Sequence, residues 1–246
     1  MHATNAAVSG VAPTVGVFFL LWLTLDRSAA SLGSTRGEHG WLVCAIVTTV
    51  ALAAEGLLSR SGPGRSLKAL GFAFPRPGAA LLALAFAGTP LLFFSVLAGS
   101  TGEFLTAGPD FAPQAAGIFA QGGVAEELVF RGFLFRRLRA GRTFWRAAVL
   151  SSAPFVAVHG FLFVTLDFEV ALLALLLSLS LSFPLAWLFE LAGASVWPPA
   201  LVHATVQGAA KLLDAGSRAS GAVALWMVFS ATTPWLFLLW RPRDER

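Results

Sequence analysis

Long apolar runs, separated by short polar segments, make up most of this chain of 246 residues. A helix needs about 20 mostly apolar residues to cross the hydrocarbon core of a bilayer. The runs predict eight membrane-spanning helices, at residues 11–25, 40–58, 79–99, 112–135, 144–162, 169–190, 196–213 and 221–240. The sequence lacks the short alternating segments of a membrane β-barrel. We therefore expect an all-α polytopic membrane protein with about eight transmembrane helices.

Nothing in the sequence divides the chain into separate units. We find no internal repeat, no low-complexity block and no long linker, so we predict a single membrane domain over residues 1–246. The composition, 57% hydrophobic and 12% charged, agrees with a polytopic membrane protein. Cys44 is the only cysteine, which excludes an intrachain disulfide and a thiolate metal site.

The loops between the predicted helices alternate in charge. Segments 59–78 and 136–146 carry Arg and Lys without acids, whereas 100–110 and 167–169 carry acids without bases. The positive-inside rule then places the basic loops and both termini in the cytoplasm, although the slightly basic segment 214–220 fits poorly. The same rule accounts for the net charge of +4, so we expect no nucleic-acid partner. No Lys or Arg precedes the first apolar run, which favours a retained helix over a signal peptide.

One apolar segment, GGVAEELVFRGFLFRRL, contains a cluster of charges. Charged side chains inside a bilayer are costly and rare, so this cluster indicates a functional site. On a helix, Glu127 and Arg131 lie one turn apart and are expected to form an ion pair. Glu126 points elsewhere and has no neighbouring cation in the sequence. The two glycines that begin the segment are expected to let another helix or a substrate approach closely. Glu55 and Glu190, at predicted helix ends, are expected to reach water.

Three further polar residues lie in predicted spans: His159 in the fifth, and His203 and Gln207 in the seventh. The helical rise places both histidines and Glu126 at depths that permit them to meet. A carboxylate beside an imidazole can remove a proton from water. A second imidazole and an amide N–H can stabilise the oxyanion formed when that water adds to a peptide carbonyl. Two histidines and a carboxylate can instead hold zinc, and the residues alone leave both mechanisms open.

Three motifs, in this order, resemble the signatures of the CPBP family of intramembrane proteases, also called the CAAX prenyl protease or Abi family. They are Glu126-Glu127-Leu-Val-Phe-Arg131 for EExxxR, Phe155-Val-Ala-Val-His159 for FxxxH and His203-Ala-Thr-Val-Gln207 for HxxxN. The resemblance covers roughly residues 110–215, with Leu70-Gly71-Phe72 in an earlier basic loop. The chain departs from the family at Gln207, where Asn is usual. Gln keeps the amide donor on an arm longer by about 1.5 Å.

The resemblance implies an active site buried in the helix bundle. The residues that it implies to be catalytic are Glu126, His159, His203 and Gln207. The first two of these would activate water, and the last two would stabilise the oxyanion. The residues that it implies to support the site are Glu127, Arg131 and Phe155. Family members are described both as glutamate-dependent and as metal-dependent. If a divalent metal such as zinc is bound, the expected ligands are Glu126, His159 and His203.

From the motifs and the resemblance we expect an intramembrane endopeptidase of a bacterial or archaeal cytoplasmic membrane. Its partners would be the lipid bilayer and a membrane-anchored protein or peptide, processed as a CAAX tail, a maturing peptide or a C-terminal anchor. A non-catalytic immunity or scaffold protein with this fold is one alternative. A transporter is another, because intramembrane Glu, His and Arg also make proton relays.

Overall fold

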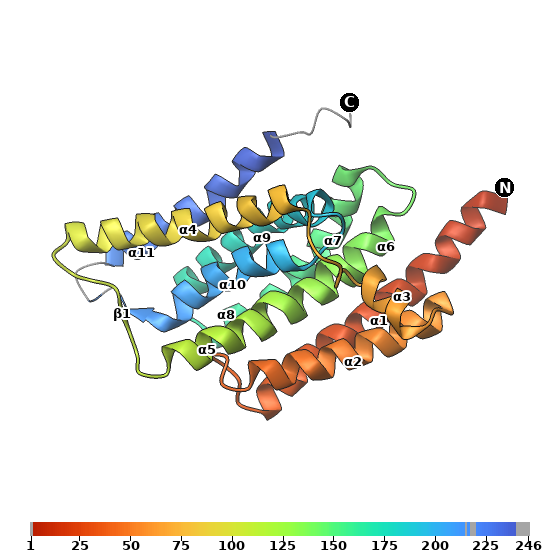
Figure 1. Ribbon diagram of the computed structural model, residues 1–246, viewed down its shortest axis with the longest axis horizontal. Coiled ribbons are helices and arrows are strands. Elements are labelled where there is room, and N and C mark those ends of the chain that lie inside the picture. The colour runs from red at the N-terminus through yellow and green to blue at the C-terminus, as the bar shows by residue number, and fades with distance from the viewer. Residues whose placement is uncertain (1, 215, 217–219, 240–246) are drawn as a thin grey trace.

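The computed structural model describes residues 2–214, 216 and 220–239, and the side chains of residues 12–214, 216 and 221–236. Figure 1 shows a bundle of roughly aligned helices. In chain order the elements are α1 (His2–Ser31), α2 (Gly40–Ser59), α3 (Pro63–Ala69), α4 (Pro77–Ser100), β1 (Thr106–Ala107), α5 (Phe111–Ile118), the π-helices η1 (Phe119–Ala125) and η2 (Leu128–Phe135), α6 (Arg136–Arg139), α7 (Phe144–His159), α8 (Leu162–Thr165), α9 (Phe168–Leu191), α10 (Trp197–Leu212), β2 (Leu213–Asp214), α11 (Ser220–Thr232) and the 3₁₀-helix η4 (Thr233–Leu239).

Four described helical segments are long and apolar enough to cross a membrane: Gly40–Ser59, Pro77–Ser100, Phe144–Thr165 and Phe168–Leu191. The chain is therefore a helical membrane protein, but by this criterion the described residues contain four candidate spans and not the eight that we predicted. Each predicted span is nevertheless mainly helical where it is described, and the last one runs on to residue 240, outside the described residues. The central helices fall short because α10 has only 16 residues and the run from α5 to α6 alternates between α and π winding and carries the charged cluster.

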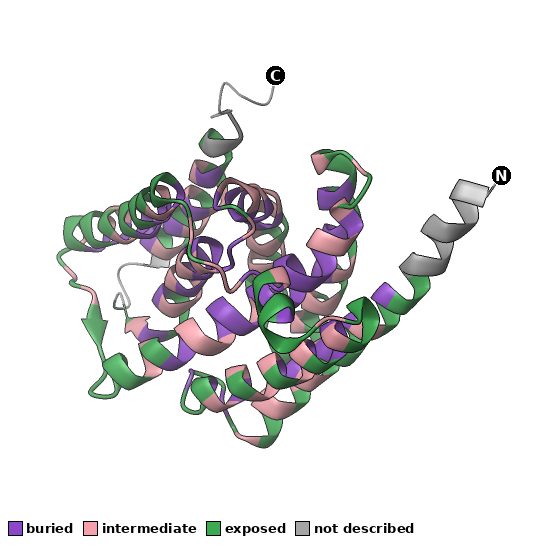
Figure 2. Cartoon of the chain, turned by 45° about the vertical axis from the view of Figure 1, so that its right-hand side comes forward, coloured by how far each residue is buried: buried purple, intermediate pink, exposed green. Residues whose placement is uncertain are grey.

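The helix expected over residues 112–135 is present as one uninterrupted helical run, but it is wound largely as two π-helices on either side of Glu126 and Glu127. All eight residues of η2 are buried. Helices α1, α2 and α7 pack around η2, and α2 and α10 pack against η1. Figure 2 shows the buried residues gathered inside the bundle, with exposed residues on the outer helices. π-Turns are rare and are frequent at functional sites, and here they occupy the central helix of the bundle.

Two short segments pair where we predicted no strand. Residues Thr106–Ala107 of β1 pair antiparallel with Leu213–Asp214 of β2. The sequence contains no strand pattern there because only two residues on each side take part. The pairing joins two loops that are distant in sequence, so the fold and not local propensity creates it.

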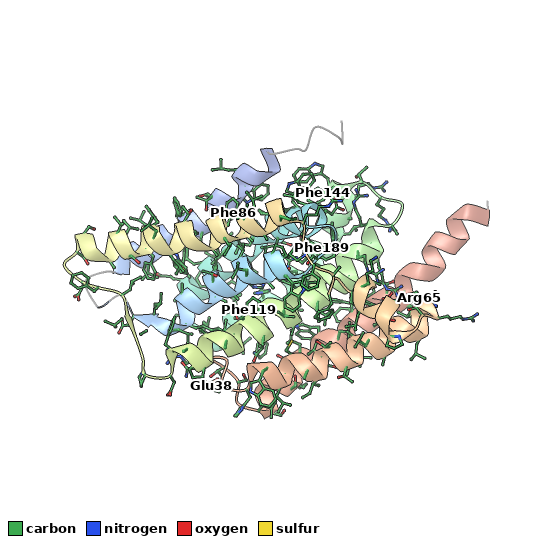
Figure 3. The ribbon with its side chains drawn as sticks, viewed as in Figure 1. Glu38, Arg65, Phe86, Phe119, Phe144 and Phe189 are labelled. Atoms are coloured by element: carbon green, nitrogen blue, oxygen red, sulfur yellow. The ribbon has the colours of Figure 1, made fainter. Side chains whose placement is uncertain are left out.

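The loops gather at two opposite ends of the bundle. At the first, which we call the basic end, Arg139 Nε lies 2.5 Å from Glu190 Oε1 and Arg76 N–H donates to Ala192 O at 3.2 Å. At the second, which we call the loop end, the β1–β2 ladder lies beside a hydrogen bond of 2.6 Å from Arg36 Nη2 to Lys211 O. Figure 3 labels one residue of each end, Arg65 and Glu38, on opposite sides of the molecule.

The expectation that Glu55 reaches water at its helix end is wrong, because this carboxylate is only 1% exposed. Its Oε2 atom lies 2.7 Å from Arg136 Nη2 and 2.8 Å from Arg137 Nη2. Ser59 donates to the other oxygen at 2.7 Å. Two arginines from the central helix cover the carboxylate, and this packing could not be read from α2 alone. The cluster ties the end of α2 to α6.

Candidate active site

Glu127 is the buried centre of the charged cluster. Its side chain is fully buried, and its Oε1 atom lies 2.9 Å from Arg131 Nη1, so the ion pair expected from the sequence is present. The same oxygen accepts a hydrogen bond of 2.9 Å from His203 Nδ1. An ionised carboxylate can only accept, so His203 must carry its proton on Nδ1 in this contact. Glu127 thereby fixes the ring orientation of His203, which the sequence did not indicate.

Arg131 connects three helices around this centre. Its Nη2 atom donates to Ser182 O of α9 at 3.3 Å. Its guanidinium carbon lies 4.9 Å from the centre of the Phe155 ring of α7, within cation–π range. Because its side chain is buried and paired with Glu127, the arginine holds η2 against α7 and α9. This arrangement agrees with a supporting position.

Glu126, the residue before Glu127, meets two side chains of α10. Gln207 Nε2 donates to Glu126 Oε1 at 3.3 Å, and His203 Nε2 lies 3.7 Å from Glu126 Oε2. The Glu126 side chain remains 17% exposed, and it lines a cavity. The carboxylate that lacked a cation in the sequence therefore has an imidazole and an amide beside it in the fold.

His159 is placed by Phe155, one turn earlier on α7. His159 Nδ1 lies 2.8 Å from the Phe155 carbonyl oxygen, and the two rings are 4.5 Å apart. The carbonyl can only accept, so Nδ1 carries the proton and Nε2 of a neutral ring is free to accept one. His159 and Glu126 line the same cavity, although no direct hydrogen bond joins them in the described part of the chain.

The two glycines that precede the charged cluster are Gly122 and Gly123, and α10 approaches them closely, as the sequence predicted. A Cβ atom on Gly122 would lie 1.8 Å from Gln207 Oε1, and one on Gly123 would lie 2.8 Å from Ala200 O. The first contact explains how the chain accommodates Gln where the family usually has Asn. The longer side chain occupies the space that Gly122 leaves empty.

Gly132 makes a similar close contact that the sequence analysis missed. A Cβ atom there would lie 2.3 Å from Leu70 O. Gly71 O in turn accepts a hydrogen bond of 3.0 Å from Val196 N, at the start of α10. The loop with Leu70 and Gly71 thus links η2 to α10. The sequence drew attention to Leu70-Gly71-Phe72, but only the fold shows that Leu70 packs against Gly132.

The shared cavity has a volume of about 390 Å³ and lies between α1 and α7. Gln121 and Lys211 also line it, and sequence reasoning had not selected either residue. Gln121 accepts a hydrogen bond of 2.7 Å from Ser34 Oγ, which anchors the loop between α1 and α2. The cavity is large enough for part of a peptide and brings it to Glu126 and His159.

The three expected metal ligands do not gather around one point. Among the described residues, no group of three or more His, Cys, Asp or Glu side chains is arranged to hold a metal ion. His203 and His159 use Nδ1 to bond Glu127 and the Phe155 carbonyl, so only their Nε2 atoms would be available to a metal. The donor set in this geometry does not fit a three-ligand zinc centre, so no step below passes through a metal.

One comparison with known families found a match, and it covers the segment that contains this site. Residues 108–209 match the family model described as "Type II CAAX prenyl endopeptidase Rce1-like". This segment is therefore similar to the CAAX protease family. The matched segment contains all three motifs, and with them the converging side chains described above. No curated protein matches the sequence significantly.

Proposed function

We propose that the chain is an intramembrane endopeptidase that hydrolyses a peptide bond of a membrane-anchored protein or peptide, using a water molecule activated by Glu126. One observation carries the proposal. Glu126 borders an open cavity and has two nitrogen donors, His203 Nε2 at 3.7 Å and Gln207 Nε2 at 3.3 Å, from the neighbouring helix. A base and two oxyanion donors at one point are what peptide hydrolysis needs.

In the first step, a water in the cavity gives a proton to Glu126 and its oxygen attacks the carbonyl carbon of the bound peptide. His159 faces the same cavity with Nε2 unprotonated, so it can orient this water by accepting its second hydrogen. A positioned general base contributes typically 10²–10⁴-fold. The partial exposure of Glu126 to the cavity gives the water access to the carboxylate.

His203 and Gln207 then stabilise the oxyanion of the tetrahedral intermediate. Donation from His203 Nε2 requires the doubly protonated ring, because Nδ1 already donates to Glu127. The imidazolium balances charge within the site. The carboxylates of Glu126 and Glu127 are offset by Arg131 and by His203, so the buried group of four is neutral. The intermediate collapses when the C–N bond breaks and the proton held by Glu126 passes to the leaving amine.

Cleavage by the purified full-length chain in liposomes tests the proposal. The substrates are a prenylated CAAX peptide and a reporter with an apolar C-terminal anchor, each carrying a fluorophore pair across the scissile segment. We expect the wild type to cleave at least one, and Glu126→Ala and His159→Ala each to lose at least 10²-fold in turnover. Equal turnover in either variant would remove that residue from the mechanism. If a chelator abolishes the activity and added zinc restores it, the reaction depends on a metal and the metal-free mechanism is wrong.

A further inference from the structure

The cavity opens toward the loop end of the bundle. Its rim is formed by the last turns of α1, α7 and α10, by α8 and by the loop between α1 and α2. The rim residues are Arg27, Ala30, Ser34, Thr35, Leu162 and Lys211. All of these segments lie at the end opposite to the loop before α4 and the loop after α6 (Figure 1).

Glu126 lies closer to this rim than to the basic end. The rim meets the central helix at Gln121, which bonds Ser34 and lies five residues before Glu126. At the helical rise this separation is roughly 8 Å, whereas Arg136 at the basic end is roughly 15 Å from Glu126. Toward the basic end, a separate cavity of about 410 Å³ is lined by Phe18, Leu134 and Leu138 among others, and Glu126 does not line it. The site is therefore reached from the loop end.

Charge assigns the two ends to the two sides of the membrane. The described residues of the basic end include Arg60, Arg65, Lys68, Arg76, Arg136, Arg137, Arg139, Arg142 and Arg146, with Glu55 and Glu190 bound among them. The described acids of the loop end are Asp26, Glu38, Glu103, Asp110, Asp167, Glu169 and Asp214, against the bases Arg27, Arg36 and Lys211. Basic residues near the ends of spans are retained in the cytoplasm, so the cavity mouth faces the non-cytoplasmic side.

The cavity also has an apolar side toward the lipid. Helix α1 packs on α2 and η2, while α7 packs on α9 and η2, so the two helices flank the cavity. Its wall there is made of large apolar side chains, and the polar groups lie at the rim and at the catalytic end. The apolar wall residues are Trp22, Leu25, Phe130, Val158 and Phe161. An apolar segment can enter between α1 and α7 without leaving a hydrocarbon-like environment.

We propose that the substrate is a protein anchored in the membrane whose scissile bond lies just inside the non-cytoplasmic surface of the bilayer. The apolar anchor lies between α1 and α7, and the polar part of the substrate leaves through the rim. This inference rests on the proposed function and specifies the substrate of the same site. A tail tethered to the cytoplasmic surface would meet the basic end, whose cavity is not lined by Glu126.

Thiol labelling tests the orientation without requiring activity. In a Cys44→Ala background, Thr35→Cys places one thiol on the exposed rim, and Gly64→Cys places one at the basic end, where a Cβ atom meets nothing within 4 Å. In intact cells, a membrane-impermeant maleimide is expected to label the rim cysteine. It is expected to label the other cysteine only after permeabilisation. The reverse pattern would overturn the inference and leave the proposed hydrolysis standing.

Cleavage of paired reporters tests the substrate class. Two single-span reporters carry the same scissile segment, one on the cytoplasmic and one on the non-cytoplasmic side of the anchor, and are co-expressed with wild type or Glu126→Ala. We expect Glu126-dependent cleavage of the non-cytoplasmic reporter. Cleavage of the cytoplasmic reporter is expected to be at least tenfold lower. Preferential or equal cleavage of the cytoplasmic reporter would refute the inference. Failure of both with the wild type, despite rim labelling from outside, would count against the proposed function instead.

Discussion

Replacing Gly122 by Ala should lower the turnover of the enzyme without lowering its thermal stability. In Gly122→Ala the new Cβ atom would lie 1.8 Å from Gln207 Oε1 and 2.6 Å from Gln207 Cδ. Carbon atoms of this kind essentially never approach within 3.0 Å, so the amide has to move by about 1.2 Å. The hydrogen bond to Glu126 is already 3.3 Å long, and this movement breaks it.

The expected result is a loss of turnover without a loss of stability. Removing one oxyanion donor costs about 10²–10³-fold in kcat. The displaced atoms are the end of a flexible side chain, and Ala is favoured over Gly within a helix by about 0.5–1 kcal/mol. We therefore expect an unchanged or higher Tm in detergent, together with a fall of about 10²-fold or more in reporter cleavage in liposomes. Gly88→Ala, where a Cβ atom meets nothing within 4 Å, is the matched control and should retain full turnover.

A second substitution tests whether the clash is the cause. Gln207→Asn shortens the side chain by about 1.5 Å, which exceeds the displacement that the methyl group of Gly122→Ala would require. The double variant Gly122→Ala/Gln207→Asn should therefore recover part of the turnover that Gly122→Ala loses. Such non-additivity is expected of residues in direct contact. A double variant no more active than Gly122→Ala, or full activity in Gly122→Ala alone, would refute the reasoning.

Two further predictions concern stability, measured by thermal unfolding in detergent. Arg131→Ala and Glu127→Ala should each destabilise by about 3–5 kcal/mol, because each leaves a buried charge without its partner, and the double variant should lose less than either single variant; equal Tm values for all three would contradict this. Gly132→Ala should lower Tm, since its Cβ atom would lie 2.3 Å from Leu70 O and backbone movement of this kind costs about 1–3 kcal/mol. A Tm equal to that of the Gly88→Ala control would show that the Leu70 loop can move without a measurable cost in stability.

Local sequence was sufficient for features that depend on one helix. The apolar runs located the helical segments because burial in lipid or in a bundle requires such runs. The spacing of Glu127 and Arg131 predicted their ion pair, since residues four apart on a helix share a face. The number of membrane-spanning helices was harder to predict from the sequence. Glu126 and its neighbours occupy the centre of the bundle, where packing against other helices offsets a lower apolar content.

Features that depend on several helices required the tertiary structure. The sequence by itself determined which residue types are available for chemistry, because a carboxylate or an imidazole in an apolar run is costly and rare whatever surrounds it. It could not determine that Gln207 fits against Gly122, that Glu127 orients His203, or that the cavity opens at the end away from the basic loops. Those relations are set by the close packing of α10 on η1 and of α1 and α7 around η2. Distances between helices are fixed only when their side chains interdigitate.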